Sequence, residues 1–272
     1  GYLGIFILTL GTRKLLGHIT PGFDEYESFF LYLSDLVLIA PIFLAIKNKY
    51  LRLPQTVLIG FIGFAFISIF SAFSIPLAIY SFARLMLVII AALSVAALIQ
   101  KEFLKTEWLF GGIAIAAVIQ SVIGIGQFIF QKSIGLAWLG EPMIGPTISG
   151  ASKIVVEGVR ILRAYGTFPH PNILAAFLLL GLISLCYFWL KGDANIQMNT
   201  NYTNPIIRVI RRYSYISIAI GIFAIFLGLI LAFSRAAWLV GGFVIAALLI
   251  KSLFSQEKFR QAPTPEREPA QN

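Results

Sequence analysis

Three arginines stand where apolar segments of this sequence begin, and guanidinium groups are suited to binding phosphate. Each lies at or shortly before the start of an apolar run: Arg84, Arg163 and Arg235. If the runs are helices that start on one side of a membrane, each arginine lies near the positive end of a helix dipole, which disfavours a cation by about 0.3–1 kcal/mol. An anion arriving there would also meet the exposed N–H groups of the helix start. We therefore expect these arginines to bind an anion, and the alternative is that they reach lipid headgroups.

Two further side chains lie close to these arginines in the sequence or in the expected bundle. His170 precedes the apolar run that follows Arg163, and a histidine can act as a general base near neutral pH. The alternative is that His170 stabilises the proline-rich start of that run. Asp35 lies near the outer end of another run, where a lone carboxylate is costly. We expect Asp35 to pair with Arg84 in a structural rather than a catalytic role.

Polar groups also occur inside and after a later apolar run. Gln120 and Gln127 are seven residues apart and so share one helix face, with Gly124 between them. We expect them to bind neighbouring helices, and the alternative is that they contact a ligand. Glu141 is expected to be a solvated loop charge, with a catalytic role as the alternative. Two histidines and one cysteine are scattered, so we expect neither a zinc-type metal site nor a cofactor.

The composition identifies the elements that must position these residues as membrane helices. Of 272 residues, 58% are hydrophobic and only 12% are charged, whereas a soluble domain carries about 25% charged residues. We predict an all-α fold, a polytopic transmembrane helix bundle with about seven complete spans and a partial one at the N-terminus, because about 20 apolar residues are needed to cross a bilayer. The expected spans are residues 1–10 (partial), 29–46, 56–73, 84–100, 108–130, 172–190, 215–233 and 236–252.

The basic residues set the expected orientation. The net charge is +9, but lysines and arginines gather in the loops between apolar runs, which is typical of a membrane protein rather than of one that binds nucleic acid. If the loop 47–55 is cytoplasmic, 13 of the 21 basic residues lie inside and 8 outside. Residues 131–171 then form a long outer loop of a transmembrane domain, 1–255, and the polar segment 256–272 is expected to be a disordered cytoplasmic tail.

Several stretches resemble the O-antigen ligase and O-antigen polymerase superfamily of bacterial membrane glycosyltransferases. The stretch RAYGTFPHPNILA at 163–175 is similar to that family's first hallmark, and LAFSRAAW at 231–238 is similar to its second. Three shorter stretches are also similar to this group: QSVIGIGQ at 120–127, GEP at 140–142 and YLSD at 32–35. Together these similarities touch most of the chain in the expected order.

The resemblance implies an enzyme that transfers a glycan from a polyprenyl-diphosphate donor to a hydroxyl of a glycan, lipid or protein acceptor. It implies a location in the bacterial inner membrane, with an active site that faces outward and needs no metal. It further implies that Arg163 and Arg235 contact the donor diphosphate. The remaining motif residues Gly166, Pro171 and Asn172 are expected to have structural roles.

Alternatives remain open at this point. A polysaccharide polymerase belongs to the same superfamily, and a transporter or flippase of an anionic lipid-linked glycan belongs to another class, as does a non-catalytic membrane scaffold. A transporter is expected to have broken helices or internal repeats at the membrane midplane, and the sequence shows neither clearly. The family carries a further outer loop with a histidine downstream, and this chain ends after 236–252. We therefore expect either a fragment that begins inside a span or an incomplete, inactive member.

Overall fold

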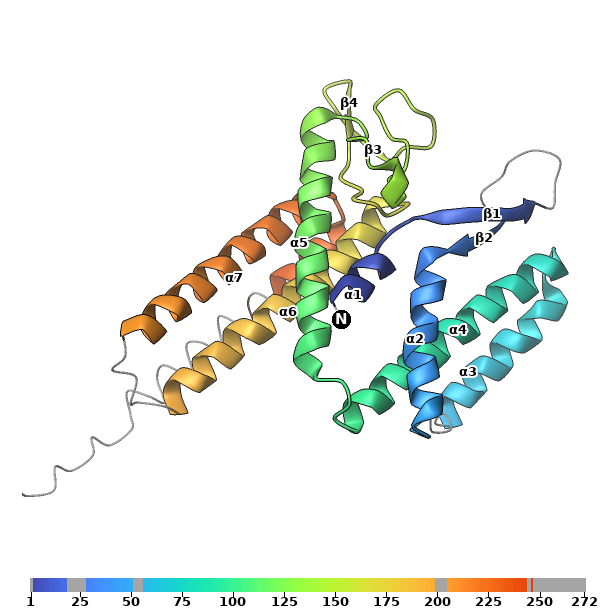
Figure 1. Ribbon diagram of the computed structural model, residues 1–272. Coiled ribbons are helices and arrows are strands. Elements are labelled where there is room, and N and C mark those ends of the chain that lie inside the picture. The colour runs from blue at the N-terminus through green and yellow to red at the C-terminus, as the bar shows by residue number, and fades with distance from the viewer. Residues whose placement is uncertain (1, 19–27, 51–55, 199–204, 244–245, 247–272) are drawn as a thin grey trace, which may run out of the picture.

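The chain is described by a computed structural model that covers residues 2–18, 28–50, 56–198, 205–243 and 246 (Figure 1). Helices account for most of this part of the chain. The helices are α1 (Tyr2–Leu8), α2 (Leu33–Lys47), α3 (Thr56–Ile67), α4 (Ile75–Gln100), α5 (Thr106–Phe130), α6 (Pro171–Met198), α7 (Pro205–Leu231) and a last helical segment over 235–243. Short 3₁₀ turns follow α3 at Ser68–Ser71 and lie in the loop after α5 at Ala137–Leu139.

Two antiparallel hairpins correct the all-α prediction. Strand β1 (Arg13–His18) pairs with β2 (Ser28–Tyr32), and β3 (Lys153–Val156) pairs with β4 (Val159–Leu162). The expected span 29–46 therefore begins as a strand, because its aromatic start SFFLY has high strand propensity and finds a partner strand upstream.

The start of α4 also differs from the prediction, and this changes the place of Arg84. The helix begins at Ile75 rather than at residue 84, after an extended Ser74 and with a proline in its first turn. Proline suits that position because it has no N–H to leave unpaired. Arg84 therefore lies inside α4 and not at its N-terminus, so the helix-dipole argument does not apply to it.

In the described part of the chain, three helices are long and apolar enough to cross a membrane. They are α4, α5 and the segment Pro171–Lys191 of α6. The apolar helices Leu58–Ser71 and Tyr215–Leu231 are shorter. Helix α2 has 15 residues, which gives about 22 Å against a hydrocarbon core of about 30 Å.

Helices α5, α6 and α7 pack against one another and enclose the largest buried cluster. Small residues let these helices approach closely, as is usual between helices in a membrane. A Cβ atom added at Gly181 of α6 would lie 2.1 Å from the Cβ of Ala117 of α5. A Cβ added at Gly228 of α7 would lie 2.5 Å from the Oγ of Ser121, whose hydroxyl also donates to the carbonyl oxygen of Ala224.

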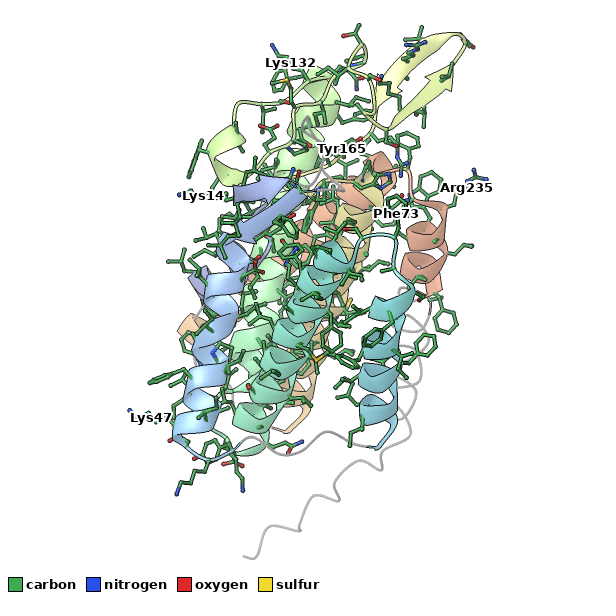
Figure 2. The ribbon with its side chains drawn as sticks, turned by 90° about the vertical axis from the view of Figure 1, so that its right-hand side faces the viewer. Lys14, Lys47, Phe73, Lys132, Tyr165 and Arg235 are labelled. Carbon is green, nitrogen blue, oxygen red and sulfur yellow. The ribbon has the colours of Figure 1, made fainter. Side chains whose placement is uncertain are left out.

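The helix ends gather at two opposite ends of the molecule. Figure 2 shows Lys47, at the end of α2, far from Lys132, at the start of the loop after α5. Tyr165 and Arg235 lie toward the Lys132 end. The loop 131–170, which carries β3 and β4, lies at that end, beside the end of α5 and above the start of α6 (Figure 1). The residues of both hallmark stretches that Figure 2 labels thus lie at the same end of the bundle.

Candidate functional site

Arg163 lies between the loop 131–170 and two helix ends. Its Nε and Nη2 atoms donate to the carbonyl oxygen of Ala232, at 2.8 and 2.6 Å. Nη2 also donates to Oδ1 of Asn172 at 2.7 Å, and Nη1 donates to the Oγ of Ser152 at 2.9 Å. These bonds use four of the five guanidinium N–H groups. Within the part of the chain that the structure describes, the second N–H group of Nη1 has no acceptor and can donate to a ligand.

The surroundings of Arg163 are polar but uncharged at the atoms that it contacts. Partial burial lowers the pKa of Arg163 below its ordinary value, and the nearby Tyr165 opposes that shift. An arginine stays protonated at neutral pH even so. Among the residues that the structure describes, all the oxygens that accept from this guanidinium are neutral, so none of them compensates its positive charge. The charge is therefore available to an anion at this end of the bundle.

Arg235 shares the same end of the bundle but not the same contacts. It is exposed at the start of the helical segment 235–243, three residues after Ala232, whose carbonyl accepts from Arg163. Figure 2 shows the side chain of Arg235 extending away from the bundle. The structure thus brings the two backbones close together, whereas it does not turn both guanidinium groups into one pocket.

The predicted pairing of Asp35 with Arg84 is confirmed. Nη2 of Arg84 lies 3.2 Å from Oδ1 of Asp35, which is itself buried. The other carboxylate oxygen accepts from the backbone N–H of Tyr32 at 3.1 Å, and the Arg84 guanidinium lies 4.2 Å from the ring centroid of Tyr32. This cluster joins β2, α2 and α4. The contacts of Arg84 place it in a structural cluster apart from Arg163, so the structure does not unite the three arginines in one site.

His170 caps the N-terminus of α6. Its Nδ1 accepts from the backbone N–H of Asn172 at 3.1 Å, and its carbonyl oxygen accepts from Ile173 at 3.0 Å. Pro171 follows as a fully buried residue in the first turn. The structural alternative for His170 is therefore confirmed: it stabilises the start of the helix. Partial burial lowers the pKa of His170, and the charge of Arg163 lowers it further.

Gln120 and Gln127 share a face of α5, as predicted. Gln120 bonds to Thr9, directly after α1, but most of the hydrogen bonds of the two glutamines go to a loop rather than to a neighbouring helix. Both are fully buried and hold the backbone of the first hallmark stretch. Oε1 of Gln127 accepts from the N–H groups of Tyr165 and Gly166, at 3.0 and 2.8 Å. Oε1 of Gln120 accepts from the N–H of Thr167 at 2.9 Å. The spacing of the two glutamines predicted their shared face of α5, but nothing in the sequence identified the loop that packs against this face.

Gly166 has a backbone conformation and a packing environment that suit only glycine. Its φ is +63°, which disfavours residues with a side chain. A Cβ added there would lie 2.6 Å from Oε1 of Gln120. The structural role expected for Gly166 is thus explained by the close approach of this segment to α5.

The prediction for Glu141 is wrong. Its carboxylate is buried and accepts three hydrogen bonds, from Nε2 of Gln127 at 2.9 Å and from the backbone N–H groups of Ile134 and Leu136 at 2.7 and 2.6 Å. A buried carboxylate is tolerated because these donors replace its water. The GEP stretch signals a turn, but nothing in the sequence identifies Gln127 as the partner of this carboxylate.

Two threonines that the sequence analysis did not single out complete the buried network. Nε2 of Gln120 donates to the hydroxyl oxygens of Thr9 and Thr167, at 2.9 and 2.8 Å. The Thr167 hydroxyl in turn donates to the carbonyl oxygen of Thr9 at 2.8 Å. The end of α1 is thereby joined to the hallmark stretch through α5. Within the residues that the structure describes, no group of three or more His, Cys, Asp or Glu side chains could hold a metal ion.

Comparisons with family models, with curated proteins and with solved structures found no match to this chain.

Proposed function

We propose that this chain is a membrane-embedded glycosyltransferase of the O-antigen ligase type, which takes a glycan from a polyprenyl-diphosphate donor. The observation that supports it best is the guanidinium of Arg163, which is held beside the N-terminus of α6 by oxygens that, among the described residues, are all neutral. Guanidinium groups at a helix start provide charge and directed N–H donors for phosphate. The resemblance of residues 163–175 and 231–238 to the family hallmarks supports the same assignment.

The proposed reaction is an exchange of bonds at the anomeric carbon of the donor glycan. The acceptor hydroxyl oxygen forms a bond to that carbon while the bond to the diphosphate oxygen breaks, and the diphosphate leaves with the electron pair. Arg163 stabilises the charge that develops on the leaving group, and a positioned cation does this best where water is excluded. The hydroxyl proton must pass to a base.

His170 is poorly arranged to be that base in this structure. Its Nδ1 already accepts a hydrogen bond from Asn172, so the neutral ring carries its proton on Nε2. The ring can take up a further proton only at Nδ1, which would end the cap of α6. We therefore propose a structural role for His170 and assign the base to no residue of this chain.

The finer topology is part of the proposal. We propose about seven spans and a partial one, with residues 131–171 on the outer side of a bacterial inner membrane and 47–55 and 191–214 in the cytoplasm. The opposite placement of Lys47 and Lys132 in Figure 2 supports the alternation of sides. The excess of basic residues in the loops assigned to the cytoplasm supports the orientation.

Donor binding tests the function directly. Undecaprenyl diphosphate is titrated into the detergent-solubilised protein, with undecaprenol as the ligand that lacks the diphosphate. Loss of a charge-assisted hydrogen bond costs about 1.5–3 kcal/mol, so Arg163→Ala should weaken binding roughly ten- to a hundredfold. Arg163→Lys should recover only part of the affinity because lysine lacks the bidentate fork.

The matched control is Arg160→Ala, which removes an exposed arginine from β4 three residues before Arg163. It should bind the diphosphate like the wild type. Arg235→Ala shows whether the site uses both arginines. Weaker diphosphate binding indicates that it does, and unchanged binding indicates a site built on Arg163 alone. Wild-type affinity in both Arg163→Ala and Arg235→Ala would refute the proposal and leave these arginines as headgroup anchors.

A further inference from the structure

Six consecutive backbone N–H groups, those of residues 162–167, all donate hydrogen bonds. Four of the six donate to glutamine side chains, which lie on one face of α5 or at its C-terminal cap residue. Leu162 donates to Oε1 of Gln131 at 2.7 Å, Tyr165 and Gly166 donate to Gln127, and Thr167 donates to Gln120. The spacing of these glutamines, seven and then four residues, places them on one side of the helix. We call them the α5 glutamine row: Gln120, Gln127 and Gln131.

The two remaining N–H groups are held from other sides. Arg163 donates to the carbonyl oxygen of Ser152 at 3.4 Å, and Ala164 donates to the carbonyl oxygen of Leu231 at 3.0 Å. The backbone on both sides of Arg163 is therefore fixed by contacts that do not involve its guanidinium. The side chain can exchange its neutral partners for a phosphate while its Cα atom stays in place. Such preorganisation lowers the entropic cost of binding.

Glu141 fixes the orientation of the central glutamine of this row. Nε2 of Gln127 donates both to Oε1 of Glu141 and to the carbonyl oxygen of Gly166, at 2.9 and 2.8 Å. A carboxylate accepts hydrogen bonds and cannot donate them, so the amide cannot turn its oxygen toward Glu141. Oε1 of Gln127 must then face the N–H groups of Tyr165 and Gly166.

We infer that Gln127 and Glu141 are positioning residues for the diphosphate site, acting through the backbone that presents Arg163. This rests on the proposed function, because it assigns the site a second layer of residues that never touch the donor. The alternative is that the row only folds the loop 131–170 and does not affect affinity.

Gln127→Glu tests the inference because it places a carboxylate against Glu141 and removes both Nε2 donors. Undecaprenyl diphosphate should bind about tenfold or more weakly, since small displacements of a positioned group have effects of that size. Amide hydrogen exchange at Tyr165 and Gly166 should become faster. The double variant Gln127→Glu with Glu141→Gln restores a carboxylate–amide pair between these two positions but not the donor to Gly166, so it should recover part of the affinity.

Two controls separate positioning from a general loss of stability. Gly181→Ala loosens the α5–α6 contact, where its Cβ would lie 2.1 Å from that of Ala117, without touching the glutamine row. At a temperature where it remains folded it should bind the diphosphate like the wild type. Gln100→Glu makes the same chemical change at the exposed C-terminus of α4 and should alter nothing.

The possible outcomes distinguish this inference from the function on which it rests. If Arg163→Ala and Arg235→Ala both bind like the wild type, the proposed function fails. If only Arg163→Ala binds like the wild type, the positioning inference is overturned, because the arginine that it positions does not bind the donor. If Arg163→Ala binds weakly while Gln127→Glu binds normally, only the positioning inference is overturned. Equal losses in Gly181→Ala and Gln127→Glu would also overturn it. If Gln127→Glu does not fold, Glu141→Gln decides: it should fold and bind more weakly, and wild-type affinity would contradict the inference.

Discussion

The guanidinium of Arg163 donates two hydrogen bonds to one carbonyl oxygen, that of Ala232, from Nε at 2.8 Å and from Nη2 at 2.6 Å. Ala232 directly follows α7, at a helix end where the last carbonyl groups have no partner within the helix. The same guanidinium reaches Asn172 in the first turn of α6. One side chain thus joins the end of α7 to the start of α6 while it keeps a charge for an anion.

Arg163→Lys should destabilise the protein because the ammonium group cannot reproduce this planar set of contacts. Lysine keeps the charge but cannot reach Ala232, Asn172 and Ser152 together. We expect a loss of about 1–3 kcal/mol in the free energy of unfolding, measured by denaturation in detergent. Arg160→Lys, at an exposed position of β4, should change it by less than about 0.5 kcal/mol. Equal losses in the two variants would show that the contacts of Arg163 do not stabilise the fold.

The pKa of His170 should depend on Arg163. Burial is the larger cause that lowers this pKa, and the charge of Arg163 is the second. Arg163→Ala should therefore raise the pKa of His170 toward its ordinary value without fully restoring it. The measurement is an NMR titration of protein labelled at histidine. An unchanged pKa in Arg163→Ala would show that the two side chains are not electrostatically coupled.

The lowered pKa of His170 also predicts how stability depends on pH. The folded state holds the ring neutral to a lower pH than the unfolded state does, so the unfolded state binds more protons between the lowered pKa and about 6.5. Stability should rise with pH across that window and fall as pH decreases through it. His170→Asn keeps an oxygen that can cap α6 but does not titrate. That variant should lose this part of the pH dependence, as followed by thermal unfolding at several pH values.

The ion pair of Asp35 and Arg84 should stabilise the packing of α2 against α4. Asp35→Asn keeps an acceptor for the N–H of Tyr32 but removes the charge that faces Arg84. Because Arg84 is partly exposed, we expect a loss of about 1–2 kcal/mol, at the low end for bonds to a charged group. A double-mutant cycle with Arg84→Gln measures the coupling. A coupling free energy near zero would mean that the pair does not stabilise the fold.

The sequence predicted those features that depend on local pattern or on the cost of a charge in an apolar run. Helix α5 begins within two residues of its expected start, and the pairing of Asp35 with Arg84 followed from the cost of a lone carboxylate. The expected span 84–100 misses the start of α4 at Ile75 although Pro76 marks it, because the length that a bilayer requires sets only a lower bound on a helix. The burial of Glu141 depends on a contact with Gln127, and no periodicity signals a partner in an irregular loop.

The proposed orientation can be measured at two exposed positions on opposite ends of the molecule. Ser149 lies in the loop 131–170, and Lys47 ends α2 (Figure 2). In intact cells, a membrane-impermeant thiol reagent should label Ser149→Cys and spare Lys47→Cys. The natural Cys186 is buried in α6, and a Cys186→Ser background removes any contribution from it. Labelling of Lys47→Cys alone would reverse the assignment.

Gly166→Ala should be more damaging than the same change at another glycine with positive φ. Gly166 and Gly150 have φ values of +63° and +78°, so alanine costs about 1–2 kcal/mol at either position for its backbone alone. A Cβ at Gly150 meets nothing within 4 Å, whereas a Cβ at Gly166 would lie 2.6 Å from Oε1 of Gln120. That amide cannot move aside freely, because it is bonded to Thr9 and Thr167.

Displacing the Gln120 amide should therefore cost a further amount of about 1–3 kcal/mol, the usual penalty for buried polar groups that lose their partners. The measurement is the difference in the free energy of unfolding between Gly166→Ala and Gly150→Ala. A Gln120→Ala background removes the shortest contact and leaves one of 3.1 Å to Cδ1 of Leu174, so in that background the difference between the two glycine variants should become smaller. If they already have the same cost in the wild type, the close approach of Gly166 to α5 does not contribute to stability.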